Sequence, residues 1–358
     1  MKIELNKNKV YFNNGSLKKE IHPFWLRERV DGEEFLDKGT QQRLFDPTSL
    51  DSEILINRAY INDEFLEIDF NDGVNSKLNI NKLALEFSNE DIIIKSIPKT
   101  KWDSTLKNIK NYEYQDNFFE SKEMHDLLVS FYKYGFVIIK NIPTNNNFIV
   151  KFANSIGSVR KTNFGEYFDV KSKPNPNDLA YTSLNLSPHT DNPYRNPVPC
   201  IQLLHCIENE VSGGLSTLVD GFTVTEDLKN ENLKFYKILC DVKVRFRFID
   251  KEVVLEDWSE LIKLNDDKTF KQVRFSPRMD YVPILDKEKL DLYYKARKKL
   301  SEMYNSKKYK IEFKLVSKDL MMIDNYRLLH GRTAYETKEG NRFLQGCYID
   351  YDSTEGKL

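Results

Sequence analysis

The sequence predicts a mainly β protein with flanking helices, in which a jelly-roll barrel follows a smaller β-rich module. Three observations predict this fold class. Short apolar stretches separated by turn-forming residues recur through the second half of the chain, as the strands of a barrel do. The few stretches with helical spacing lie around them. The start of the chain is rich in strand patterns and contains a hairpin signal.

Residues 1–95 are predicted to form the small N-terminal domain. Two strands and a turn are indicated by KIELNKNKVYF, and a hairpin is indicated by FLEIDF, Asn-Asp-Gly and KLNI. Between them lies HPFWLRERV, which is aromatic enough to be buried. The polar stretch from Lys95 to Asp116 has weak periodicity, so we place the boundary there and assign residues 96–358 to the second domain.

The second domain is predicted to begin with helices and continue with strands. Glu123 to Tyr134 has an apolar side and ends before Gly135. A strand, FVIIKNIP, and a short helix from Phe148 to Ile156 follow. Later elements are strands and turns from Leu179 to Asp220, a helix from Asp286 to Tyr304, and strands at KIEFKLV, LMMID and FLQGCYIDY.

Composition excludes several classes of protein. Of 358 residues, 40% are hydrophobic and 30% charged, which is typical of a globular protein. With 54 basic and 55 acidic residues, the chain lacks the basic excess of a nucleic-acid or membrane-surface binder. The N-terminus has no signal-peptide pattern, and no apolar run is long enough to span a membrane. The four cysteines lack CxxC spacing, so we expect reduced thiols and a cytoplasmic protein.

The chemistry is indicated by a His-x-Asp pattern at His189 and Asp191. On a strand, these side chains point to the same side and can reach one metal ion. The pattern alone is weak, because it also occurs as a hydrogen-bonded surface pair. His330 follows an apolar strand, precedes a plausible turn at Gly331, and is the best third ligand. Two histidines and one carboxylate with open positions suit iron(II).

Arg342 strengthens this interpretation. It lies twelve residues beyond His330 and opens the apolar strand FLQGCYIDY. A buried arginine needs an anionic partner, and its fork suits a carboxylate such as the distal one of 2-oxoglutarate. The alternative is an ordinary salt bridge to a protein carboxylate.

Several long segments carry a resemblance to a known family: HPFWLRER, AYTSLNLSPHTDNPYRNPVP, IQLLHCIENEVSGGLSTLVDGF and DNYRLLHGRTAYE. The chain resembles the γ-butyrobetaine dioxygenase-like branch of the taurine dioxygenase (TauD/TfdA) superfamily, over nearly its whole length. The resemblance implies a double-stranded β-helix catalytic domain, a homodimer, and hydroxylation that uses iron(II), 2-oxoglutarate and O2, with ascorbate as reductant. It implies His189, Asp191 and His330 as iron ligands, and Arg342, Ser216 and Leu204 as the 2-oxoglutarate site.

The resemblance also implies an aromatic site for a trimethylammonium group, which binds by cation–π attraction. The matching positions are Phe164, Phe168, Tyr181 and Tyr348, with Asp178 beside them. Phe164 and Phe168 replace the family's usual Tyr and Trp and present weaker ring faces, so plain core residues are the alternative. For Asp178 the alternative is a solvated loop residue.

Contacts to an anionic end of the substrate are implied at Asn192, Tyr194, Ser276 and Arg278, where Ser276 and Arg278 fall at the place of a usual Asn. γ-Butyrobetaine is therefore the first candidate substrate. 2-Trimethylaminoethylphosphonate, trimethyllysine, or another small cationic or amino-acid-like molecule are the alternatives.

Three further expectations complete the interpretation. Several family members bind zinc through cysteines in the N-terminal domain, but the matching stretch RERVDGEEFLDKG has none, so no zinc is expected. His205, in the apolar strand IQLLHC, is expected to be a hydrogen-bonded core histidine. Two other classes stay open: a catalytically silent relative, against which the intact ligand set argues, and a cupin-type isomerase or hydrolase, against which Arg342 argues.

Overall fold

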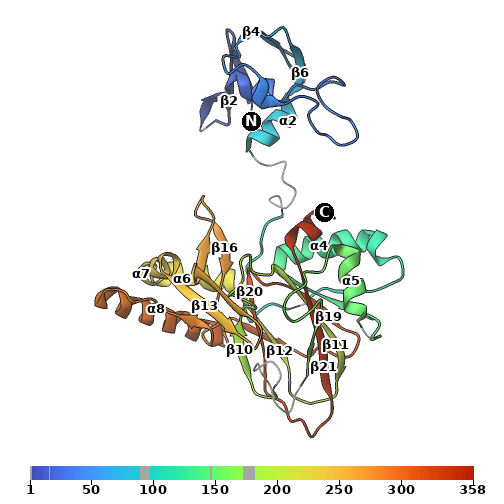
Figure 1. The fold of residues 1–358 in the computed structure, drawn as a ribbon, viewed down its shortest axis with the longest axis vertical. Helices are drawn as coiled ribbons and strands as arrows, with labels where there is room; N and C mark the ends of the chain where they lie inside the picture. Colours follow the sequence, from blue (N-terminus) through green and yellow to red (C-terminus); the bar gives the residue numbers. More distant parts are fainter. Residues whose placement is uncertain (1, 16, 89–96, 108, 146, 172–181) are drawn as a thin grey trace. The chain divides into compact units, whose positions relative to one another are not determined.

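The computed structural model describes residues 2–15, 17–88, 97–107, 109–145, 147–171 and 182–358. The chain divides into two compact units, Met1–Ser96 and Ile97–Leu358 (Figure 1). The division lies beside the boundary that we placed after residue 95. None of the helices within the described ranges combines the length and the apolar composition that crossing a membrane requires.

The first unit contains two three-stranded antiparallel sheets. The expected hairpin is confirmed, and its turn residue Gly73 has a φ of +86°, which glycine adopts without strain. Alternate residues of its first strand, Leu66, Ile68 and Phe70, are buried in the core of this unit. The elements are β1 (Lys2–Asn6), β2 (Lys9–Asn13), β3 (Lys18–Glu20), α1 (Pro23–Arg27), η1 (Pro47–Ser49), β4 (Ile56–Asn62), β5 (Phe65–Phe70), β6 (Asn75–Asn79) and α2 (Ile80–Ser88).

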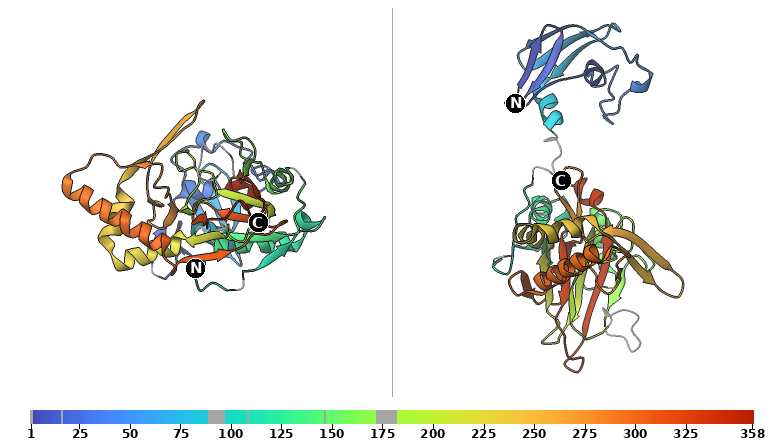
Figure 2. Two further views of the ribbon diagram at one scale, coloured as in Figure 1. Left: turned by 90° about the horizontal axis from the view of Figure 1, so that it is seen from below. Right: turned by 90° about the vertical axis from the view of Figure 1, so that its left-hand side faces the viewer.

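The second unit is built on two sheets. The six-stranded sheet has the order β7 (Asn111–Glu113), β8 (Phe136–Lys140), β19 (Leu320–Asp324), β11 (Ile201–Asn209), β21 (Arg342–Ile349) and β9 (Phe168–Val170). The four-stranded sheet has the order β10 (Leu186–His189), β20 (Leu328–Arg332), β12 (Ser216–Asp220) and β18 (Lys310–Phe313). Buried residues of both sheets, such as Ile323 and Leu344 from one and Leu218 from the other, form a single cluster. The two sheets therefore face each other across a shared core (Figures 1 and 2).

Helices pack against both sheets. The predicted helices are confirmed as α4 (Lys122–Tyr134), α5 (Phe148–Ile156) and α8 (Lys287–Asn305). Gly135 ends α4 with a φ of 83°. The sequence analysis did not identify α6 (Gly221–Glu231), α7 (Leu233–Asp241) or the hairpin of β13 (Lys243–Ile249) and β14 (Val254–Glu260). The remaining elements are η2 (Phe118–Glu120), β15 (Ile262–Leu264), β16 (Phe270–Val273), β17 (Asp280–Tyr281) and α9 (Tyr351–Glu355).

A buried ion pair fixes the turn that leads into β20. Arg327 donates from Nε and Nη2 to the two carboxylate oxygens of Asp220 at 2.9 and 2.8 Å. The same guanidinium donates to the carbonyls of Thr100 and Lys133. A buried charge pair is retained only when its remaining donors are satisfied, as they are here. This network joins the end of β12 to the turn before β20.

Candidate active site

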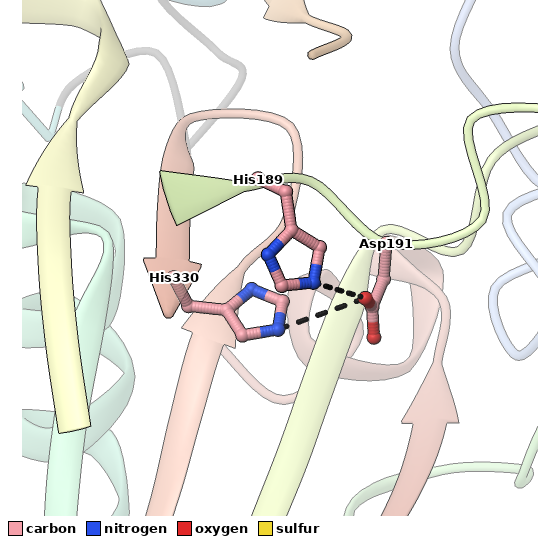
Figure 3. A group of neighbouring side chains, drawn as sticks. All are labelled: His189, Asp191 and His330. Atoms are coloured by element: carbon pink, nitrogen blue, oxygen red, sulfur yellow. Dashed lines mark ion pairs between the residues drawn. The ribbon is translucent and has the colours of Figure 1, made fainter. Parts of the chain in front are cut away.

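The side chains of His189, Asp191 and His330 converge (Figure 3). His189 is the last residue of β10, Asp191 follows that strand, and His330 is in the middle of β20. Asp191 Oδ1 lies 3.4 Å from His189 Nε2 and 3.6 Å from His330 Nε2. One ligand atom from each of the three residues lies within 4.8 Å of the others, a spacing that can hold a metal ion. Both histidines are buried, so little water competes for their nitrogen atoms.

The sheet brings the two histidines together. β10 and β20 pair antiparallel, and His189 and His330 are direct cross-strand partners with ring centroids 4.5 Å apart. His189 Nδ1 lies 2.9 Å from the carbonyl of Ser187. Because a carbonyl only accepts, Nδ1 carries the proton and the Nε2 lone pair faces Asp191. Burial lowers the pKa of His330 to about 4, so this ring is neutral at pH 7 and can donate its lone pair to a metal ion.

Asp191 reaches the histidines in a different way from the one expected. Strand alternation does not place it, because β10 ends at His189 and Asp191 lies in the following loop. Its backbone is held by the side-chain amide of Asn325. Asn325 Oδ1 accepts from the Asp191 N–H at 2.8 Å, and Nδ2 donates to the Asp191 carbonyl at 3.0 Å. Asn325 is fully buried, so this loop is as firmly placed as a strand.

Gly331 is likewise not the turn that we expected, because it lies inside β20. A Cβ at this position would lie 2.4 Å from the carbonyl oxygen of Leu186 on the neighbouring strand. The glycine is therefore required by the close approach of β10, the strand that carries His189.

The Asp191 carboxylate uses its two oxygens differently. Oδ1 faces the histidines, whereas Oδ2 accepts hydrogen bonds from Gln202 Nε2 at 2.6 Å and from the Tyr348 hydroxyl at 2.7 Å. Burial alone would raise the Asp191 pKa, but His330, His189 and Tyr348 outweigh it and hold this pKa well below its usual range. The carboxylate is therefore ionised, and with the two imidazoles it forms the set that suits iron(II).

Two pockets meet at His189 and Asp191, and His330 lines the first of them. We call the first the arginine pocket. Its lining is Phe168, Val170, Leu186, His189, Asp191, Gln202, Leu204, Ser216, Met321, His330, Gly331, Arg332, Arg342 and Leu344. It brings together the three residues predicted to bind 2-oxoglutarate: Leu204 on β11, Ser216 on β12 and Arg342 on β21.

Arg342 is buried without a compensating charge. Its Nε donates to the carbonyl of Gly214 at 3.3 Å, and no carboxylate of the described residues pairs with it. Burial and the neighbouring Arg332 lower the Arg342 pKa to about 10. The ordinary salt bridge that we held as the alternative is therefore not formed within the described residues. A buried cation without a protein partner favours an anionic ligand. A Cβ on Gly214 would lie 2.8 Å from Arg342 Nε, so only a glycine leaves room for the arginine side chain in this position.

We call the second pocket the aromatic pocket. Its lining is Phe164, Phe168, Val170, His189, Thr190, Asp191, Asn192, Tyr194, Ser276, Arg278, Met279 and Tyr348. The structure thus brings together seven of the nine residues predicted to contact substrate. The other two, Asp178 and Tyr181, lie outside the described residues.

One side of the aromatic pocket is a run of ring contacts. Phe168 lies 5.4 Å from Tyr348 and 6.5 Å from Phe164, measured between ring centroids. Phe164 in turn packs against Phe248, which stacks on Tyr194 at 4.9 Å. Phe164 and Phe168 are half-buried rather than plain core residues. Ring faces at a pocket wall suit a cation.

The other side presents hydrogen-bond donors. Asn192 Oδ1 accepts from the Tyr194 hydroxyl at 2.6 Å, which fixes the amide and leaves Nδ2 as its donor end. Asn192 Nδ2 and Ser276 Oγ are buried and have no hydrogen-bond partner among the described residues. Buried donors without partners are costly, so they indicate a ligand with acceptor oxygens. Arg278 lines the same pocket.

Sequence reasoning missed four residues of this region: Gln202, Asn325, Arg332 and Phe248. A signal existed for Gln202, which is a polar residue inside the apolar strand IQLLHC. Asn325 gave no local signal, because its partner Asp191 is 134 residues away. His205 is fully buried as expected, but neither ring nitrogen has a hydrogen-bond partner in the described part of the chain.

Comparison with known proteins gives a consistent answer. The profile of the family described as "Taurine catabolism dioxygenase TauD, TfdA family" matches residues 105–348. γ-Butyrobetaine dioxygenase of Pseudomonas sp. (strain AK-1) is 28% identical over 343 residues, which cover 94% of this chain and 89% of that protein. The Homo sapiens γ-butyrobetaine dioxygenase is 31% identical over 272 residues, covering 72% and 67%. The mitochondrial trimethyllysine dioxygenase of Bos taurus is 26% identical over 347 residues, covering 92% and 79%.

Among solved structures, an asparagine oxygenase matches with a TM-score of 0.52 at 12% identity, covering 68% of this chain and 93% of the other. A second structure of asparagine oxygenase, in complex with Fe(II), 2S,3S-3-hydroxyasparagine and succinate, matches with a TM-score of 0.51 at 13% identity, covering 67% and 93%. At this level of identity, the likeness establishes a shared fold.

Proposed function

Because this chain belongs to the TauD/TfdA dioxygenase family, we propose that it is an iron(II)- and 2-oxoglutarate-dependent hydroxylase of a small zwitterion with a quaternary ammonium group. The observation that carries the proposal is the meeting of two unlike pockets at one ligand set. One pocket holds a buried, uncompensated arginine, and the other joins aromatic rings to unpartnered donors.

His189, Asp191 and His330 would hold the iron, and two imidazoles with an ionised carboxylate are a ligand set that fits it. When bound, iron supplies the activation of O2 that lets 2-oxoglutarate be converted to succinate and CO2 while a substrate C–H bond becomes C–OH. Ascorbate would keep the metal reduced. The protein positions both organic molecules and excludes water from the buried ligand set.

The arginine pocket would bind 2-oxoglutarate. Arg342 provides a fork of donors for the distal carboxylate, and Ser216 adds a buried hydroxyl. Leu204 forms part of the apolar wall beside the carbon chain. Since Arg342 and the ligand set line the same pocket, a dicarboxylate bound there would contact both.

The aromatic pocket would bind the substrate with its charges separated. Phe164, Phe168 and Tyr348 present ring faces to the cation. Asn192 and Ser276 present donors to the anion. Tyr194 orients Asn192, and Arg278 adds positive charge on the same side. γ-Butyrobetaine carries both charges on one short chain, and the Pseudomonas relative that aligns with 94% of this chain is named for it.

Specific observations favour two alternatives. Similarity to trimethyllysine dioxygenases over 92% of the chain supports trimethyllysine. Several donors on the anion side, including an arginine, support the three-oxygen anion of 2-trimethylaminoethylphosphonate. Another small cationic or amino-acid-like substrate would use the same two sides.

The remaining proposals concern architecture. We infer that the two facing sheets form the double-stranded β-helix of the catalytic domain, residues 96–358. Residues 1–95 form the N-terminal domain. We infer a homodimer in the cytoplasm, without nucleic-acid or membrane partners, as the resemblance and the balanced charge suggest.

Substrate-stimulated succinate formation tests the proposal. Purified protein is incubated with iron(II), ascorbate, O2 and 2-oxoglutarate, and each of the three trimethylammonium compounds is added separately. We expect γ-butyrobetaine to stimulate succinate most and to give a product heavier by one oxygen atom. Stimulation by another compound would reassign the substrate. Succinate that none of them stimulates would refute the quaternary-ammonium assignment, and no succinate at all would favour a silent relative.

A further inference from the structure

Gln202 and Tyr348 form a cross-strand pair, and both donate a hydrogen bond to the same oxygen of the Asp191 carboxylate. They are direct partners in the register of β11 and β21, so their side chains leave the sheet on the same face. Both donate to Asp191 Oδ2, at 2.6 and 2.7 Å. Their exposed fractions are 2% and 4%, so neither hydrogen bond competes with bulk water.

Each of the two side chains acts only as a hydrogen-bond donor toward the Asp191 carboxylate. A glutamine can donate only from Nε2, and that atom faces Asp191. The carboxylate oxygen can only accept, so the Tyr348 hydroxyl is the donor of its hydrogen bond. Asn325 holds the Asp191 backbone at the same time. Rotation of the carboxylate would break two buried hydrogen bonds, each of which involves a charged group.

The result is that Oδ1, the oxygen without such donors, faces His189 Nε2 and His330 Nε2. We propose that Gln202 and Tyr348 are positioning residues that restrict Asp191 to binding metal through Oδ1 alone. This inference rests on the proposed function for the identity of the metal. A carboxylate that bound through both oxygens would take up a further coordination position, whereas a set of two histidines and one carboxylate works by leaving positions open.

The pair also connects the two pockets. Gln202 lines the arginine pocket, and Tyr348 lines the aromatic pocket. The same carboxylate oxygen therefore receives one hydrogen bond from the wall of each pocket. The Tyr348 ring and hydroxyl have separate roles in this account: the ring faces the substrate cation, and the hydroxyl orients the metal ligand.

Cobalt(II) titration of the purified protein tests the inference without turnover, because the visible absorption of cobalt reports its ligand geometry. The variants are Gln202→Leu, which removes the amide at similar size, and Tyr348→Phe, which removes one oxygen atom. We expect each to raise the cobalt Kd about 10- to 100-fold, the usual effect of losing a partner of a metal ligand, and to change the cobalt spectrum. Tyr348→Phe keeps the ring and the fold, so the test stands even if Gln202→Leu does not fold.

Matched controls lie outside the site. Gln345 is an equally buried glutamine on β21 that donates to Asp169, and Tyr132 is a buried tyrosine bonded to Thr354. Gln345→Leu and Tyr132→Phe should leave the cobalt Kd and spectrum unchanged. The inference is overturned if Tyr348→Phe matches the wild type in both readouts, or if the controls shift as much as the site variants. Wild-type protein that binds no cobalt would instead refute the metal site and the proposed function with it.

Discussion

The arginine pocket and the aromatic pocket share His189, Asp191, Phe168 and Val170, yet they are built from different parts of the fold. Apart from Asp191, every residue that lines the arginine pocket belongs to a β-strand. Most of the aromatic pocket comes from segments outside strands, including those of Phe164, Asn192 and Ser276. The difference indicates that strands place the residues of one pocket and connecting segments place most residues of the other.

Sheet residues are fixed by ladder hydrogen bonds and by a shared core, whereas connecting segments tolerate substitution more readily. The chemistry that we propose to be common to the family, metal and 2-oxoglutarate binding, therefore lies on the sheets. Substrate choice lies mainly on the connections. Most departures from the family pattern follow the same division, because Phe164, Ser276 and Arg278 lie on connections. Phe168 is the exception and lies on β9, whereas the matching residues Arg342 and Ser216 lie on strands.

The largest effect is predicted for loss of a metal ligand, because both pockets depend on the metal. His330→Ala removes a ligand of the metal that both pockets serve, and its side chain lines the arginine pocket. Succinate formation should fall by more than about 100-fold, beyond the loss typical for partners of metal ligands, both with and without added substrate. Coupled assays across a range of iron(II) concentrations measure this. Activity that persists at low iron would place the metal elsewhere.

Arg342→Lys should affect the arginine pocket alone. Lysine keeps the charge but loses the fork that fits a carboxylate, so the KM for 2-oxoglutarate should rise about 10- to 100-fold. The KM for the primary substrate and the affinity for cobalt(II) should change little. A larger effect on the primary substrate than on 2-oxoglutarate would reverse our assignment of the two pockets.

Ser276→Ala should affect the aromatic pocket alone, and less strongly. The lost hydroxyl removes one hydrogen bond to the substrate anion, which raises the substrate KM about two- to tenfold and leaves the KM for 2-oxoglutarate unchanged. Ser259→Ala is the matched control, since Ser259 is equally buried but lies on β14, outside both pockets. Equal effects of the two variants would show that Ser276 does not contact substrate.

His205 should affect neither pocket at neutral pH. It points to the face of β11 opposite Gln202 and Leu204. Burial lowers its pKa to about 4, so it is neutral in the fold, whereas the unfolded chain binds a proton near its ordinary pKa of about 6.5. The stability that neutral His205 contributes is therefore fully present above the pKa of the unfolded chain. It is lost as the pH falls from that pKa toward the pKa of the folded protein.

At about pH 5, proton binding by His205 in the unfolded chain should lower the free energy of unfolding by about 2 kcal/mol relative to neutral pH. Urea unfolding of the wild type and of His205→Leu, at about pH 7.5 and about pH 5, measures the difference. The variant should lose less stability than the wild type on acidification. An identical loss would mean that His205 is protonated or hydrogen-bonded in the folded protein.

The sequence predicted those features that depend on local pattern. Helical spacing indicated α4 and α8, and the residue types of the His-x-Asp pattern with His330 and Arg342 indicated the chemistry. What it did not predict depends on register between distant strands. The contact of Tyr348 with Asp191 joins residues 157 positions apart, and it exists only because Tyr348 faces Gln202 across the ladder.

Two local interpretations were wrong for related reasons. Gly331 is a common turn residue, but here it makes room for a neighbouring strand. Asp191 follows a strand pattern, but it is placed by Asn325 from another part of the chain. In both cases a tertiary contact, absent from the local pattern, decides the conformation.

An anaerobic absorption titration tests the central claim, that two pockets serve one metal, most directly. Iron(II), 2-oxoglutarate and γ-butyrobetaine are added in that order, without O2. Chelation of iron(II) by a 2-oxo acid gives a visible charge-transfer band. We predict that the band appears with 2-oxoglutarate, shifts when γ-butyrobetaine enters the aromatic pocket, and is absent in His330→Ala. A band that appears but does not respond to any trimethylammonium compound would contradict the substrate assignment, and no band would contradict the account as a whole.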